Sequence, residues 1–134
     1  MSQTTEISDA ARTIQVTNLL GSYFDALYES DEQKMAAIFH ANGVYATADE
    51  SPLLYRDKET YLSVLSKRES PRARGEARRD VIDNIEFAGK NTARAKVRCS
   101  IGTSDFVDYL TLVKDDGRWQ IISKVFQINS RESK

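Results

Sequence analysis

The chain has 134 residues, which is enough for one domain with a single hydrophobic core. Hydrophobic residues make up 40% and charged residues 29%, values typical of a globular protein that argue against disorder of the whole chain. The 19 Lys and Arg residues nearly balance the 20 Asp and Glu residues, so no overall field draws the protein to nucleic acid or to an anionic membrane.

A long amphipathic helix is expected near the N-terminus. Ser8 is a suitable N-cap, and Asp9 suits the positive end of the helix dipole. Apolar residues then recur at the three- and four-residue spacing of one helical face: Val16, Leu19, Leu20, Tyr23, Phe24, Leu27 and Tyr28. Gly21 lies within this helix at a cost of about 1 kcal/mol relative to alanine, which suggests a close packing contact.

A second helix is expected directly after the first. The segment Ser30-Asp31-Glu32-Gln33 has the form of a capping box, which would end the first helix and begin the second. The second helix carries three apolar residues on its buried side: Met35, Ile38 and Phe39. It is expected to end near Asn42-Gly43, where a left-handed residue is easily formed.

A short strand, a loop and a third helix follow. The strand is predicted over Val44 to Thr47, and the loop over the polar residues 49–52. Asp57 can cap the third helix. The apolar residues of that helix are Tyr61, Leu62 and Leu65.

Residues 68–79 have a different character. They contain Pro71, Gly75 and five arginines, but no large apolar residue, which predicts an exposed, mobile loop. The arginines could instead grip a phosphate or a nucleic acid. Two glutamates dilute their charge, however, and the segment has no aromatic residue for stacking. We therefore favour a solvated loop, with a lid over a ligand site as the remaining alternative, and expect no nucleic-acid partner.

Beyond residue 80 the apolar period changes from about 3.6 to 2, which indicates strands. Four are predicted: Val81 to Ala88, Ala93 to Ile101, Phe106 to Lys114 and Trp119 to Ile128. Short turns separate them, so they form an antiparallel meander. Helices followed by such a sheet predict one α+β domain over residues 1–134.

Two of these strands, Phe106 to Val113 and Gln120 to Ile128, are largely apolar on both faces. The helices can cover only one face, and a second copy of the chain is the simplest cover for the other. We therefore expect a homodimer that packs through the sheet.

The expected location is cytoplasmic. Cys99 is the only cysteine, so no disulfide can form within the chain. The first seven residues are expected to be disordered and carry no apolar segment typical of a secretion signal. The longest apolar run, Met35 to Phe39, is far below the ~20 residues that span a bilayer, so no membrane contact is expected.

Four segments carry a resemblance to a known superfamily: Tyr23 to Asp31, Ala37 to Val44, Phe106 to Leu112 and Gly117 to Ile121. With this order of elements, the chain resembles the nuclear transport factor 2-like superfamily from about Ser8 to Ile128. It looks most like small bacterial proteins labelled "putative lumazine-binding", and more distantly like SnoaL-like polyketide cyclases. The resemblance implies a cone-shaped, cystatin-like fold, with three N-terminal helices packed on a curved, mainly antiparallel sheet and a cavity at its open end. The superfamily includes isomerases, dehydratases, cyclases and non-catalytic binding modules, so the fold alone defines no reaction.

Ketosteroid isomerase shares this fold and has an oxyanion hole made of a tyrosine and a protonated aspartate. The resemblance places the tyrosine on Tyr23 and the aspartate on Asp108, the two candidate catalytic residues. The general base falls on or near Thr47, and a threonine cannot accept a proton at neutral pH. That isomerisation is therefore not supported.

Asp108 shares a strand face with Phe106, Leu110 and Leu112. If this face lines the cavity, desolvation would favour the neutral acid, which could donate a hydrogen bond to a ligand carbonyl. Alternatively, Asp108 pairs with Arg98 or Lys124 or faces solvent. For Tyr23, the alternative is a core tyrosine with a satisfied hydroxyl.

The remaining candidates have similar alternatives. Tyr45, Tyr55 and Tyr61 could line the cavity or belong to the ordinary core. The full set of expected ligand contacts is Tyr23, Leu27, Tyr45, Thr47, Tyr55, Tyr61, Phe106, Asp108 and Leu110. His40 cannot form a histidine metal site alone and lies where capping or exposure is usual, although it could act as a base. Cys99 is expected to be an inert core thiol. We expect neither a metal nor a cofactor.

Three hypotheses follow. The first is a small-molecule-binding domain whose ligand is apolar with a carbonyl or ring acceptor. The second is a cofactor-free isomerase, cyclase or dehydratase, which requires a base such as Asp49 or His40 near Asp108. The third is a pure protein-interaction module, which predicts a filled cone.

Overall fold

A single long helix, α1 (Asp9–Glu29), opens the fold, and the computed structural model describes residues 8–131. The Ser8 hydroxyl accepts a hydrogen bond from the Ala11 amide (3.1 Å), so Ser8 is the N-cap, as predicted. The predicted apolar face is buried except for Tyr28, which is half-buried. Burial of this face fixes the helix against the sheet.

Gly21 contradicts one expectation. The residue is exposed, and a Cβ atom built there would meet nothing within 4 Å. The predicted close packing contact is therefore wrong, because the helix turns this position away from the sheet.

The N-cap of the second helix lies one residue later than predicted. Ser30 takes a left-handed conformation (φ 50°) and ends α1, while Asp31 caps α2 (Glu32–Ile38) by accepting from the Lys34 amide at 3.0 Å. The break lies where it was expected, but Asp31 is the N-cap in place of Ser30.

The second helix ends at Ile38, four residues before Asn42-Gly43. Phe39 already begins β1 (Phe39–Thr47), so the predicted helical end is wrong. Gly43 has no left-handed backbone; a Cβ atom there would lie 2.7 Å from the Phe39 ring. The glycine therefore allows the buried Phe39 ring to pack against its own strand.

A short strand that the sequence did not reveal, β2 (Leu54–Asp57), pairs antiparallel with β1. Asp57 then caps α3 (Lys58–Ser66), as predicted, by accepting from the Thr60 amide at 2.9 Å. Four residues with no clear alternation give little periodic signal, so β2 is defined by its partner strand.

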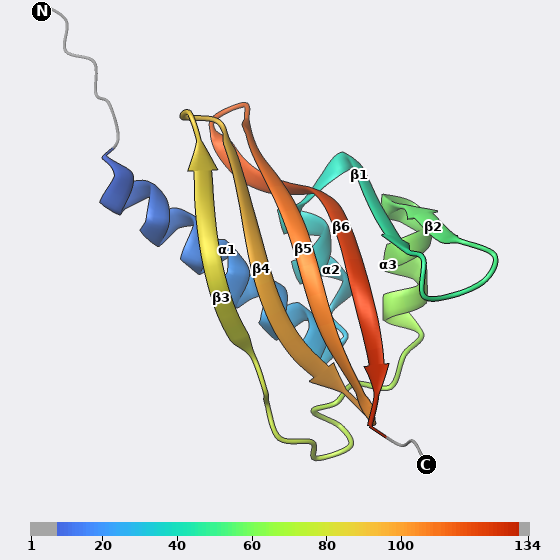
Figure 1. Ribbon diagram of the computed structural model, residues 1–134. Coiled ribbons are helices and arrows are strands. Elements are labelled where there is room, and N and C mark those ends of the chain that lie inside the picture. Colours follow the sequence, from blue (N-terminus) through green and yellow to red (C-terminus); the bar gives the residue numbers. More distant parts are fainter. Residues whose placement is uncertain (1–7, 132–134) are drawn as a thin grey trace, which may run out of the picture.

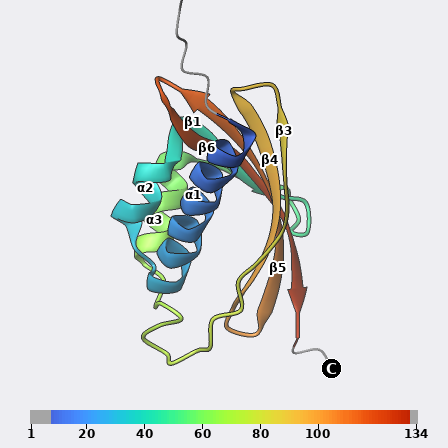
Figure 2. The same ribbon diagram turned by 90° about the vertical axis from the view of Figure 1, so that its left-hand side faces the viewer.

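The four predicted C-terminal strands are confirmed as an antiparallel meander: β3 (Val81–Ala88), β4 (Thr92–Ile101), β5 (Ser104–Asp115) and β6 (Arg118–Ser130). The sheet order is β2-β1-β6-β5-β4-β3, and β1 runs parallel to β6. All three helices lie on one face of the curved sheet, which confirms the α+β class (Figures 1 and 2).

The segment 68–79 connects α3 to β3 without helix or strand. It is exposed for most of its length, although Pro71 is buried. Glu76 ties it to the turn between β4 and β5 by accepting a hydrogen bond from the Gly102 amide at 3.0 Å, and it also pairs with Arg74. The Arg72 amide also donates to the Tyr28 carbonyl of α1 at 3.0 Å. The segment is therefore anchored at α1 and at the sheet, while its mobility stays a prediction.

Candidate functional site

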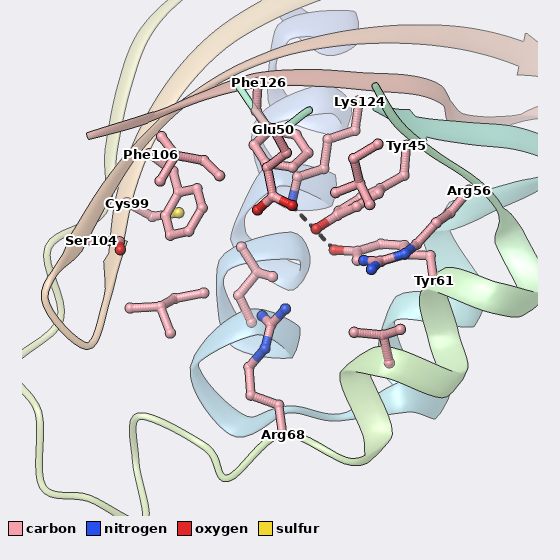
Figure 3. A pocket seen from close by; sticks show the side chains of 15 residues that line it. Tyr45, Glu50, Arg56, Tyr61, Arg68, Cys99, Ser104, Phe106, Lys124 and Phe126 are labelled. Atoms are coloured by element: carbon pink, nitrogen blue, oxygen red, sulfur yellow. Dashed lines mark hydrogen bonds between the residues drawn. The ribbon is translucent and has the colours of Figure 1, made fainter. Parts of the chain in front are cut away.

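A cavity of about 400 Å³ lies between the helices and the concave face of the sheet (Figure 3). Its walls come from β1, β2 and α3 on one side and from the ends of β4, β5 and β6 on the other, with Leu27 of α1 between them. This volume is in the range that holds a small organic ligand. The open end of the fold is therefore hollow among the described residues.

Aromatic rings form much of the cavity wall. Tyr45 and Tyr61 stack with centroids 4.3 Å apart, and Phe126 lies 4.8 Å from Tyr45 on the other side. Phe106 extends the row, with its centroid 5.9 Å from that of Phe126. Such a surface favours a flat, apolar ring, which can stack or pack edge-to-face on it.

Lys124 is the buried cation of this wall. Its side chain is 5% exposed, and its ammonium donates a hydrogen bond to the Tyr61 hydroxyl at 3.2 Å. Four aromatic centroids lie 5.1–5.4 Å from its nitrogen, close enough for cation–π attraction. Burial alone lowers the pKa of Lys124, but Tyr61 and Asp108 more than offset this and hold the pKa above its usual value. The ammonium therefore stays charged at neutral pH.

Asp108 and Tyr23, the two candidate catalytic residues, do meet. The Tyr23 hydroxyl donates to Asp108 Oδ2 at 2.5 Å, and both side chains are fully buried. Burial, and then the Asp108 carboxyl, raise the pKa of Tyr23 well above its usual value. The other oxygen, Asp108 Oδ1, has no hydrogen-bond partner among residues 8–131.

The pair lies behind the cavity wall, since neither side chain is among the residues that line it. Asp108 also forms no ion pair with either partner considered from the sequence. Arg98 pairs with Asp83 at 2.9 Å, and Lys124 is beyond ion-pair distance. Asp108 is therefore held by the first helix through Tyr23.

Of the expected ligand contacts, the cavity wall contains Leu27, Tyr45, Tyr61 and Phe106. The others lie elsewhere. Thr47 is fully buried and donates to the Phe126 carbonyl at 2.7 Å, Leu110 belongs to the core, and Tyr55 is 63% exposed on β2.

The two acid–base candidates have other partners. His40 Nε2 lies 2.8 Å from Asp115 Oδ2, and Asp49 accepts from the Ile128 amide at 2.8 Å. Cys99 lines the cavity, but burial, and then Asp108, raise the pKa of its thiol to about 12, so the neutral thiol is a poor nucleophile. No group of three or more metal-ligating side chains occurs within residues 8–131.

Four charged cavity residues were missed as site candidates: Lys124, Arg56, Arg68 and Glu50. Figure 3 shows Arg68 reaching into the cavity from the end of α3 and Glu50 entering from the opposite side. A signal existed for Lys124, because a single lysine interrupts the otherwise apolar face that includes Phe126 and Ile128. Arg56 required the unpredicted strand β2.

Two of the other hollows on the described surface are of comparable volume. One, of about 550 Å³, lies over β3, β4 and β5 and includes exposed Tyr109. The other, of about 430 Å³, lies beside Arg78 and Arg98, which are paired with aspartates. Neither has an aromatic wall with a buried charge, so the cavity at Lys124 is the stronger candidate.

Solved structures of similar fold support the architecture. An NTF-2 like protein of unknown function from Silicibacter pomeroyi DSS-3 matches with a TM-score of 0.81 and 20% identity, over 91% of this chain and 99% of that chain. A ketosteroid isomerase-like protein from Erwinia carotovora atroseptica matches with a TM-score of 0.69 and 13% identity, over 87% and 95%. A protein of unknown function with a cystatin-like fold from Nostoc punctiforme matches with a TM-score of 0.65 and 12% identity, over 93% and 96%. At these identities the similarity shows the fold, which is nuclear transport factor 2-like.

A sequence-family match gives a more specific assignment than the fold. The family model described as "Putative lumazine-binding" matches residues 11–127, and the chain belongs to that family. No curated protein gives a significant match. Within residues 8–131 no helix is long and apolar enough to cross a membrane.

Proposed function

We propose that this protein is a small-molecule-binding domain that holds a flat, largely apolar ring in the cavity at Lys124. The observation that carries the proposal is an aromatic wall with one buried ammonium, which together offer a stacking surface and a hydrogen-bond donor. A carbonyl oxygen or ring nitrogen is the acceptor that such a donor recognises.

The family description suggests the first probe. Lumazine is a pteridine ring with carbonyl oxygens, and it therefore combines a flat face with acceptors. We expect lumazine or a ketone of similar size to raise the melting temperature as its concentration increases. At 100 times the Kd the gain is about 2.7 kcal/mol, or several degrees for a chain of this length.

A variant that fills the cavity makes the test specific. Ser104 is half-buried in the cavity wall, and Ser104→Phe should abolish the melting shift by occupying the ligand's space. Ser63→Phe, on the exposed side of α3, is the matched control and should keep the shift. Absence of a shift with every probe, or an equal shift in Ser104→Phe, would reject the proposal.

A second candidate is a cofactor-free isomerase, cyclase or dehydratase. The closeness of Tyr23 and Asp108 favours it, because a tyrosine hydroxyl and a protonated carboxyl group side by side can both donate to a developing enolate. Glu50, whose carboxylate faces the cavity, is its candidate base. Binding remains the better-supported proposal, because Tyr23 and Asp108 lie behind the cavity wall.

We also propose that two copies associate through the outer face of the sheet. Tyr109 and Val125 are paired across β5 and β6 and are 61% and 47% exposed. A two-fold axis through the surface at Tyr109 and Val125 would place these side chains of both copies in contact. A net charge of -1 gives two copies little reason to repel each other, which favours a second copy as the occupant.

A further inference from the structure

The Lys124 ammonium has hydrogen-bonding capacity that the protein leaves unused. An ammonium has three N–H donors. The only hydrogen bond that it makes within residues 8–131 goes to the Tyr61 hydroxyl, and no carboxylate lies within ion-pair distance. The aromatic faces around it attract a cation but supply no oxygen acceptor. A buried ammonium with unused N–H donors is stabilised when a ligand supplies an acceptor for them.

The other charged residues of the cavity also favour an anionic ligand. Arg56 and Arg68 are half-buried in its wall, and neither has an ion-pair partner among the described residues. Glu50 is the one carboxylate in the wall. Asp108 lies behind the wall, where its Oδ2 is taken by Tyr23. The wall therefore carries three cations and one carboxylate, and this excess of positive charge favours an anionic ligand.

We propose that the ligand is an aromatic monoanion, with its carboxylate at Lys124 and its ring along Tyr45 and Phe126. This inference rests on the proposed ring-binding function and specifies the charge of the ligand. The two unused N–H donors of Lys124 match the two oxygens of a carboxylate better than a dianionic phosphate, which would need further donors. The neighbours of Lys124 in the wall are aromatic and aliphatic, and provide a ring-sized apolar surface.

Lys124 acts here as an anion receptor, with no covalent step. Imine formation requires a neutral amine, whereas the surroundings of Lys124 hold its pKa above the usual value. A carboxylate at the ammonium would complete the charge pairing inside a site of low polarity, where such contacts are strong.

The test compares three probes that share one ring: 1-naphthoate, 1-naphthamide and 1-naphthyl phosphate, by calorimetry at low ionic strength. We expect 1-naphthoate to bind at least tenfold more tightly than the neutral amide and more tightly than the phosphate. Lys124→Met keeps the length of the side chain but removes the charge, and should reduce the preference for carboxylate over amide to less than threefold. Lys96→Met, on the outer side of β4, is the matched control and should leave the preference unchanged.

Arg68→Gln provides a second variant, at a half-buried position in the cavity wall. It should weaken 1-naphthoate about threefold and leave 1-naphthamide unchanged. Tighter binding of the amide or phosphate, or a preference that survives both Lys124→Met and Arg68→Gln, overturns the anion inference while leaving ring binding intact. If lumazine, the ketones and all three naphthyl probes fail to bind, the proposed function and this inference fall together.

Discussion

The hydrogen bond between Tyr23 and Asp108 should contribute strongly to the stability of this protein. Tyr23→Phe removes only the hydroxyl and leaves a fully buried carboxyl group with no partner on either oxygen, since Asp108 Oδ1 already has none among residues 8–131. Hydrogen bonds to charged groups contribute about 1.5–3 kcal/mol, and an orphaned buried group adds a desolvation cost. We therefore expect Tyr23→Phe to lower the free energy of unfolding by about 2–3 kcal/mol.

Urea unfolding, followed by the fluorescence of buried Trp119 at one fixed protein concentration, measures this loss. With an m-value of about 1.5 kcal/mol/M, a loss of 2 kcal/mol moves the midpoint by about 1.3 M. Tyr109→Phe is the matched control, because that side chain is 61% exposed and the change should stay within about 0.5 kcal/mol.

A double-mutant cycle separates the hydrogen bond from packing. Asp108→Leu replaces the carboxyl with an apolar side chain on a strand face that also carries Leu110 and Leu112. Combined with Tyr23→Phe, it removes both polar partners, so the double variant should be more stable than Tyr23→Phe alone. A Tyr23→Phe variant as stable as the wild type, or a double variant no better than the single one, would refute the reasoning.

Two further predictions concern the surface. Gly21→Ala should raise the free energy of unfolding by about 0.5–1 kcal/mol in the same assay, because the site is an open helical position; a loss would show an unseen contact. Sedimentation at micromolar concentration should give the mass of a dimer, and Val125→Arg should give a folded monomer, since the charge would lie in the proposed interface. Ile14→Arg, at an exposed site on α1, should remain dimeric, whereas a monomeric wild type would contradict the proposal.

Local patterns account for much of the fold that could be predicted. The caps at Ser8 and Asp57, the buried face of α1 and the alternation of the four C-terminal strands all depend on residues close in sequence. Their short turns also define the meander, because only antiparallel neighbours can be joined so closely. The end of α2 was misplaced for the opposite reason. The Phe39 ring packs over Gly43, and β1 pairs with β6, about 80 residues further along the chain.

The candidate site was also predicted only in part from the sequence. The strand-face pattern placed Asp108 beside apolar residues, and the resemblance paired it with Tyr23, but only the packed chain puts both behind the cavity wall. The unused donors of Lys124 arise because α1, β1 and α3 bring rings around it from distant segments. Periodicity specifies which face of an element is buried, whereas the charge left uncompensated inside a cavity depends on long-range contacts that no local pattern encodes.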